Sequence, residues 1–167
     1  ISAAGALLWT AGGLSVAPAS TDARNPAIVA DGQGGAILGW QDSPDGFESN
    51  VYAQRIAGGG ALLWGTGGAA VCTAPGQVFP PSVLADGAGG AIFAWADNRQ
   101  GPYSDIYAQR MNANGAPVWE TDGVALCTAN WQQYDTSIIS DGAGGAIVAW
   151  HDARTSHYDY YAQHVAD

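Results

Sequence analysis

The stretch Asp86–Asp97, with the sequence DGAGGAIFAWAD, decides how the whole chain is interpreted. It recurs as DGQGGAILGWQD at residues 31–42 and as DGAGGAIVAWHD at residues 141–152, so successive copies lie 55 residues apart. Asp-Gly between two apolar runs predicts a tight β-turn, because glycine accepts positive φ without a steric penalty. The segment after each turn is apolar on both faces, which is typical of strands covered on both sides.

The tryptophans follow the same interval. Six of the seven fall into two sets, which are Trp9, Trp64, Trp119 and Trp40, Trp95, Trp150. We therefore divide the chain into three units of one domain, residues 1–55, 56–110 and 111–167, of which the first starts with a permuted outer strand. Repeats of this length that are made of short strands indicate propellers or repeat arrays.

Four strands are predicted in each unit, and no stretch shows a helical period with caps. The predicted strands are 26–30, 36–40, 51–55 and 69–72 in the first copy, 81–85, 91–95, 106–110 and 124–127 in the second, and 136–140, 146–150 and 160–164 in the third, with 14–17 as a further copy of the fourth strand. Four short strands per unit are typical of a propeller blade. A β-trefoil or a β-prism also repeats three times, but a trefoil unit is shorter. We predict an all-β propeller with three four-stranded blades per chain.

Composition excludes several classes of partner. The formal net charge is −10, the sequence pI is about 4.2, and lysine is absent. Without a basic stripe, neither nucleic acid nor an anionic membrane is an expected partner. No apolar run is long enough for a transmembrane helix. The chain starts at Ile1 rather than Met, so we expect a processed or excised segment, for which a missing signal peptide does not indicate the cytoplasm.

Two cysteines, Cys72 and Cys127, occupy equivalent places in successive units. A disulfide requires Cα atoms within about 7 Å. Equivalent points on the outer strands of neighbouring blades should lie farther apart than this, so we predict two free, buried thiols.

The repeated strings resemble known blades. DGxGGAIxxWxDxR and DIYAQR are similar to blades of secreted bacterial repeat proteins and, more distantly, to blades of sialidase-type propellers. The resemblance covers nearly the whole chain and implies a secreted or cell-surface propeller. The first unit departs from it at Ser43-Pro44, where the others have Asn98-Arg99 and Ala153-Arg154.

Three blades are too few to close a ring, since propellers have four to eight. We expect a head-to-tail homo-oligomer in which the N-terminal strand of one copy completes the last blade of the next. Two chains would give six blades and are favoured, while three would give nine. A segment of a longer single-chain propeller is the alternative.

The loops at one end of the blades differ most between units, which predicts a variable binding face on a constant scaffold. These segments are 19–25, 43–50, 74–80, 98–104, 129–135 and 153–158. They carry the candidate ligand-binding residues Trp131, Gln132, Tyr134, Phe79, Tyr103, His157, Tyr158 and Phe47. A ring beside an amide can stack on a sugar while the amide binds hydroxyls. Alternatively, the rings only cap the blade ends.

Acidic residues also recur. Asp42, Asp97 and Asp152 follow the repeat tryptophans, and Asp105 and Asp159 precede the third strand. The first three are weak Ca²⁺ candidates, but equivalent placement in every unit favours a structural role, and no cofactor is expected.

No enzymatic activity is expected. Most arginines are equivalent repeat residues rather than a dedicated cluster of the sialidase type, and the histidines lack metal-ligand spacing. We predict a non-enzymatic module that binds a glycan through the variable face. A structural or protein-contact repeat of a larger surface protein is the alternative.

Overall fold

A computed structural model of the chain describes residues 4–17, 22–44 and 46–166. Ile1 and part of the variable segment 19–25 named above lie outside the described residues. Within the described ranges the chain forms eleven strands. These ranges contain no helix long and apolar enough to cross a membrane.

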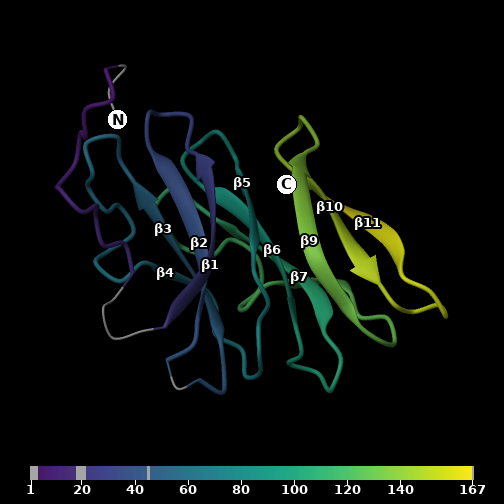
Figure 1. The fold of residues 1–167 in the computed structure, drawn as a ribbon. Helices are drawn as coiled ribbons and strands as arrows, with labels where there is room; N and C mark the ends of the chain where they lie inside the picture. Colours follow the sequence, from purple (N-terminus) through teal and green to yellow (C-terminus); the bar gives the residue numbers. More distant parts are fainter. Residues whose placement is uncertain (1–3, 18–21, 45, 167) are drawn as a thin grey trace.

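The strands form three antiparallel sheets that follow one another along the chain (Figure 1). The first sheet contains β1 (Ala23–Ala30), β2 (Ala36–Asp42), β3 (Asn50–Ile56) and β4 (Ala69–Cys72). The second contains β5 (Ser82–Ala85), β6 (Ala91–Asp97), β7 (Asp105–Met111) and β8 (Val124–Cys127). The third contains β9 (Gln133–Ser140), β10 (Ala146–Asp152) and β11 (Asp159–Val165).

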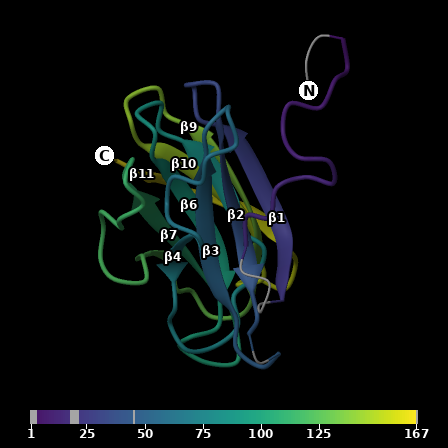
Figure 2. The same cartoon turned by 90° about the vertical axis from the view of Figure 1, so that its left-hand side faces the viewer.

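The three sheets stand face to face, as Figures 1 and 2 show from two sides. Their first strands lie next to one another, since β1 contacts β5 and β5 contacts β9. Each sheet then continues outward in strand order. This is the arrangement of blades around an axis, with β1, β5 and β9 innermost. We therefore refer to the sheets as blades 1, 2 and 3.

Eleven of the twelve predicted strands are present, and eight of them are two or three residues longer than predicted. The difference is residues 14–17, which are described but form no strand. Their counterparts β4 and β8 pair with the third strands β3 and β7 of their own sheets. No third strand lies beside residues 14–17 in the described chain, so their backbone has no ladder to join.

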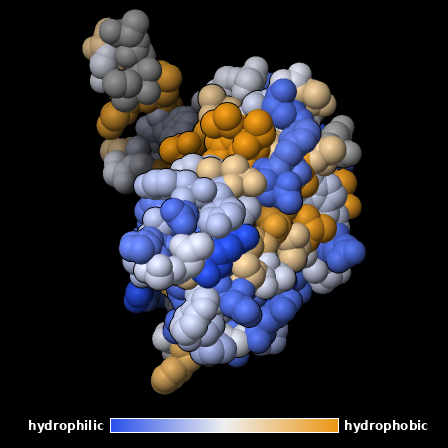
Figure 3. All heavy atoms as spheres, turned by 90° about the vertical axis from the view of Figure 1, so that its right-hand side faces the viewer, coloured by the Kyte–Doolittle hydropathy of each residue, from blue (hydrophilic) through white to orange (hydrophobic). Residues whose placement is uncertain are grey.

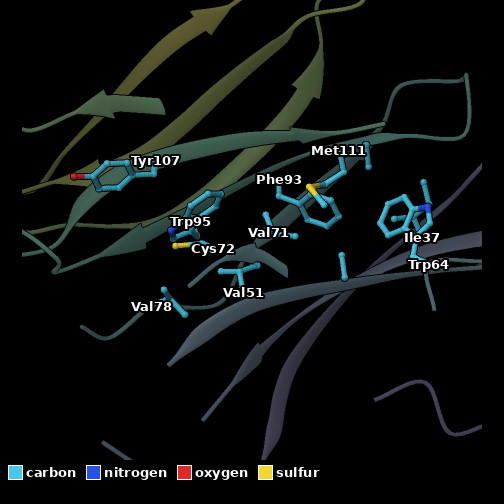
Figure 4. Close-up of a cluster of buried hydrophobic side chains, with 12 residues drawn as sticks. Ile37, Val51, Trp64, Val71, Cys72, Val78, Phe93, Trp95, Tyr107 and Met111 are labelled. Atoms are coloured by element: carbon cyan, nitrogen blue, oxygen red, sulfur yellow. The ribbon is translucent and has the colours of Figure 1, made fainter. Parts of the chain in front are cut away.

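A large residue on one blade faces a small residue on the previous blade. Phe93 of blade 2 lies against Gly39 of blade 1, where an added Cβ would come within 2.7 Å of the Phe93 ring. Ala94 of blade 2 similarly shares a buried cluster with Val148 of blade 3. Figure 4 shows the cluster between blades 1 and 2, in which Ile37 and Val51 of blade 1 meet Phe93 and other residues of blade 2.

The repeat tryptophans Trp95 and Trp150 bind the aspartates that follow them in sequence, at the edges of these interfaces. Trp95 is fully buried and donates its indole N–H to Asp97 Oδ2 at 2.8 Å. Arg99 also binds Asp97, lies 3.8 Å over the ring of Tyr107, and donates to Cys72 Sγ on blade 1 at 3.1 Å. This arginine therefore ties blade 2 to the outer strand of blade 1.

Blade 3 repeats this arrangement with Trp150, Asp152, Arg154 and Tyr161. Here Arg154 donates to Cys127 of blade 2. The first unit lacks it because Pro44 stands where the others have arginine. As a result, Trp40 Nε1 and Asp42 Oδ1 are buried without a hydrogen-bond partner among the described residues.

Both cysteines are free thiols. Cys72 is buried, and burial raises its pKa to about 11, while Cys127 is half-buried and burial also raises its pKa. Each accepts a hydrogen bond from the arginine of the next blade, so the thiols act as small packing groups with a defined partner.

Replacement of Trp95 by alanine should lower the free energy of unfolding by about 3–5 kcal/mol, because a fully buried indole is lost. The same change at Trp131, which is more than half exposed, should cost less than about 1 kcal/mol. Denaturant melts of both variants measure these values. Equal destabilisation would contradict the assignment of Trp95 to the core and Trp131 to the surface.

Asp152 should make stability depend on acid pH. Burial alone would raise the pKa of its carboxyl, but hydrogen bonds from Arg154 and Trp150 outweigh this and lower the pKa to about 2. A depressed pKa contributes stability that is complete above the unfolded value of about 3.9 and is lost as the pH falls toward 2. Asp152→Asn should therefore cost about 2 kcal/mol at neutral pH and flatten the pH dependence between about 4 and 2. Glu120→Gln, which replaces an exposed carboxylate elsewhere, is the control. It should leave the free energy of unfolding unchanged at neutral pH and throughout the range between about pH 4 and pH 2.

Candidate functional site

The variable loops at one end of the blades are tied together by buried serines. Ser49, just before β3, accepts from the backbone N–H of Val78 at 2.8 Å, and Ser104, just before β7, donates to the carbonyl of Gln133. Backbone hydrogen bonds reinforce both ties, with Gln133 N–H donating to Ser104 O at 3.0 Å. The loops between the second and third strands of blades 1 and 2 are thus fixed to the segments that enter blades 2 and 3.

The tie between blades 2 and 3 brings two aromatic rings together. Tyr103 comes from the loop between β6 and β7, and Trp131 comes from the connection between β8 and β9. Their ring centroids lie 5.2 Å apart with planes tilted by 50°. Both rings are substantially exposed, Trp131 by 54% and Tyr103 by 42%. A mixed aromatic surface of this kind suits an apolar face of a ligand with polar edges.

Trp131 has an unusual backbone conformation. Its φ is +73°, a region that bulky residues rarely adopt and that costs about 1–2 kcal/mol. The equivalent residue of the preceding unit is Gly76, which has a φ of +116°. A tryptophan therefore occupies a position whose backbone suits glycine.

A buried glutamine holds this conformation in place. Gln133 is fully buried and donates from Nε2 to the carbonyl of Trp131 at 2.7 Å. The preceding unit has Val78 at this position, which has no side-chain donor. Because Trp131 is exposed and strained, its packing contributes little to stability.

A groove of about 190 Å³ lies beside the two rings. Its lining includes Gln100, Asn130 and the buried Asp105, together with small residues and both rings. The pKa of Asp105 is raised, first by burial and then by the nearby Asp97 charge, against a smaller opposing effect of Arg99. A carboxyl with a raised pKa in a groove is a typical feature of functional sites.

Gln132 lies at the same place, but its amide is already engaged. Its Nε2 donates to Ser104 Oγ at 2.9 Å, and its backbone carbonyl accepts from Ala153 N–H. The hydrogen bond to Ser104 also fixes the orientation of the amide oxygen of Gln132. Of the predicted residues, the structure therefore brings together Trp131, Tyr103 and Gln132.

Three other predicted residues belong to blade 3. Tyr134 packs edge-on against Tyr158, with ring centroids 5.8 Å apart, and against His151 at 5.2 Å. His157 is exposed and its Nδ1 lies 3.0 Å from Ser156 Oγ. Tyr134, Tyr158 and His151 thus form a cluster that is separate from the Tyr103–Trp131 pair.

Phe79 and Phe47 also lie apart from the groove. Phe79 is half-buried and packs against the cluster between blades 2 and 3. Phe47 is strongly exposed on the loop of blade 1, and its carbonyl accepts from Gln77 Nε2 at 3.2 Å.

The recurrent aspartates serve the tryptophan–arginine pairs described above. Asp97 and Asp152 are buried and bind their own tryptophan and arginine, which leaves their oxygens occupied. Asp42 is buried in the first unit, where no arginine reaches it. The described residues contain no group of three or more potential His, Cys, Asp or Glu metal ligands.

Several residues of the site were not among the predicted ligand-binding residues, namely Gln100, Ser104, Asp105, Asn130 and Gln133. Asp105 was considered only as one of several recurring acids, and Ser104 was not considered. The signal for Asp105 was its place immediately before the third strand, beside the loop that carries Tyr103. Its burial and raised pKa depend on the neighbouring blade, which sequence spacing does not show.

Comparisons with known proteins agree with the propeller architecture. No protein-family model and no curated protein matches the chain. Among solved structures, an endo-arabinase from Bacteroides thetaiotaomicron VPI-5482 is similar, with a TM-score of 0.57 and 16% identity over 92% of this chain and 59% of that one. An α-L-arabinanase from Penicillium chrysogenum complexed with arabinobiose has a TM-score of 0.55 and 14% identity over 84% of this chain and 45% of that one. The chain thus spans about half the length of these two proteins.

These matches contradict the expectation that the chain is not an enzyme, since both similar structures are arabinanases. That expectation rested on the lack of an arginine cluster. Such a cluster is needed for sialidase-like chemistry, whereas other glycosidases need a pair of carboxyl groups. One fold can also carry many activities. At these identities the similarity establishes the fold, and the prediction of an all-β propeller built of blades is confirmed.

Proposed function

We propose that this propeller binds a glycan in the groove beside Tyr103 and Trp131. The observation that carries the proposal is Trp131 itself, an exposed ring held at positive φ where the preceding unit has glycine. A ring that only filled space would be expected in a relaxed and buried position. The competing function is a structural or protein-contact repeat, for which this loop would need no tryptophan.

The groove offers the contacts that a sugar requires. The two rings provide apolar area for the C–H face of a sugar ring. Gln100, Asn130 and Asp105 supply polar groups within the same lining. Burial raises the pKa of the Asp105 carboxyl, and its oxygens can accept hydrogen bonds from hydroxyl groups.

Arabinose oligosaccharides are the first ligands to test. The similar Penicillium structure holds arabinobiose, and a furanose or pyranose ring fits the size of a groove of about 190 Å³. Substrate contact outside the cell fits the acidic, lysine-free composition, so we place the protein in a secreted or cell-surface setting. Hydrolysis would require a second carboxyl within about 5–9.5 Å of the first. Asp105 lines the groove, and Asp97 lies opposite it in the β6–β7 register.

The substitution Trp131→Gly copies the loop of the preceding unit and separates binding from stability. We expect the free energy of unfolding to stay the same or to rise, because the strain at positive φ is removed. Glycan affinity should fall by at least about tenfold, since the stacked ring contributes about 1.4 kcal/mol or more. A glycan array selects the ligand, and calorimetric titration of both proteins measures the loss.

Trp131→Phe is the matched variant, because it keeps a ring at the same backbone position and should retain most of the affinity. The titrations are run with the thermal melt of each variant. Unchanged affinity in Trp131→Gly, or the absence of binding to any glycan on the array, would contradict the proposal and favour the structural role.

A further inference from the structure

The outward face of blade 3 carries apolar residues at positions that are buried in the other blades. Ile147 is 39% exposed, whereas its equivalents Ile37 and Ile92 are 0% and 1% exposed. Tyr160 is 79% exposed, whereas Val51 occupies this position in blade 1 at 0%. Figure 3 views the molecule from this side, where apolar patches lie between polar residues. In blades 1 and 2 the same face is covered by the next blade.

At the opposite end of the array, the N-terminal segment corresponds to the outer part of a further blade. Trp9 donates its indole N–H to the carbonyl of Gly58 at 2.9 Å, in the turn after β3. Trp64 makes the same contact one unit later, donating to Ala113 at 3.0 Å, and Trp64 belongs to the outer part of blade 1. Residues 4–17 therefore lie where the outer part of a blade preceding blade 1 would lie, and Figure 2 shows them standing away from the first sheet.

A groove of about 380 Å³ remains between this N-terminal segment and blade 1. Leu7, Leu8 and Trp9 line one side of it, and Gly34 lines the other. At the next interface the position of Gly34 is taken by Gly89, against which Arg55 of the preceding blade lies closely. The residue that corresponds to Arg55 in blade 3 is His164, which has Asp141 as its partner, just as Arg55 has Asp31.

The large and small residues also match across the two open faces. Gly39 faces Phe93 and Ala94 lies with Val148 at the interfaces that exist. The next pair in this series is Ala149 on the open face of blade 3 and Leu38 on the open face of blade 1. The face of blade 1 that contains Leu38 also has the strongly exposed Ile28.

We propose that the open face of blade 3 docks onto blade 1 of a second copy of this chain. Residues 14–17 of that copy pair with β11 and become the fourth strand of blade 3. The interface is continuous with those between blades 1, 2 and 3. Val51 pairs with Cys72, and Ile106 pairs with Cys127. The same register pairs Tyr160 with Ala17 of the second copy.

Two copies close the ring. Propellers have four to eight blades, and six is the one multiple of three in that range. The resulting contact is heterologous, and each chain offers one donor segment and one acceptor strand, so a dimer leaves neither exposed. This also removes the unpaired outer edge of β11, which would otherwise be open to aggregation.

Light scattering on the purified chain tests the assembly. We expect the mass of two 17.0 kDa chains. Ile147→Glu places a charge in the proposed interface and should give a folded monomer, as judged by an unchanged β-sheet spectrum. Val118→Glu is the matched control, because Val118 is also exposed but lies in the turn after β7, and it should remain dimeric. A monomeric parent chain, or an assembly of any other size, would overturn the proposal.

A covalent test reports the register without relying on a destabilised variant. The double variant Ala17→Cys with Tyr160→Cys should form an intermolecular disulfide under mild oxidation, because paired strand residues lie within the Cα separation that a disulfide needs. Each single variant should give no such product. A dimer in which the double variant does not cross-link would refute strand addition at β11.

Discussion

Each sheet of this chain has two apolar faces, and a second layer must cover each of them. Blade 2 satisfies this requirement on both sides, and its β6 strand is buried at every position. The covering layer is another blade of the same kind, so a large residue must always meet a small one, as Phe93 meets Gly39. The spacing of the tryptophans, the arginine bridges to the preceding blade and the two open ends of the array all follow from this requirement.

The proposed binding site depends on the same contact. Tyr103 and Trp131 come from different blades, and they meet because Ser104 and Gln133 fix the loop of blade 2 to the entry of blade 3. The fully packed interface below them supplies the rigidity that keeps Trp131 at positive φ. A variable loop can therefore carry a strained ring while the repeated scaffold remains constant, which is how loops on rigid frameworks acquire binding functions.

The sequence was sufficient for the strands and their order, because the 55-residue repeat and the Asp-Gly turns are local signals. It was not sufficient for residues 14–17, whose strand character depends on a neighbour that is not beside them. The site was predicted in part. Trp131 and Tyr103 were both predicted, the first because it alone among the tryptophans falls outside the repeat, but their pairing and the burial of Asp105 depend on how two blades meet. The same dependence explains why Tyr134, although three residues from Trp131, lies in a different cluster with Tyr158.

Large-to-small matching between blades can be measured directly with a double-mutant cycle at Gly39 and Phe93. Gly39→Ala should destabilise the chain by about 1–3 kcal/mol, because the added Cβ lies 2.7 Å from the Phe93 ring. In a Phe93→Leu background, which matches Leu38 of the first unit, the same change should cost at least about 1 kcal/mol less. Costs that are equal in the two backgrounds would show that the residues do not compete for the same space, and would contradict the account of how the blades fit together.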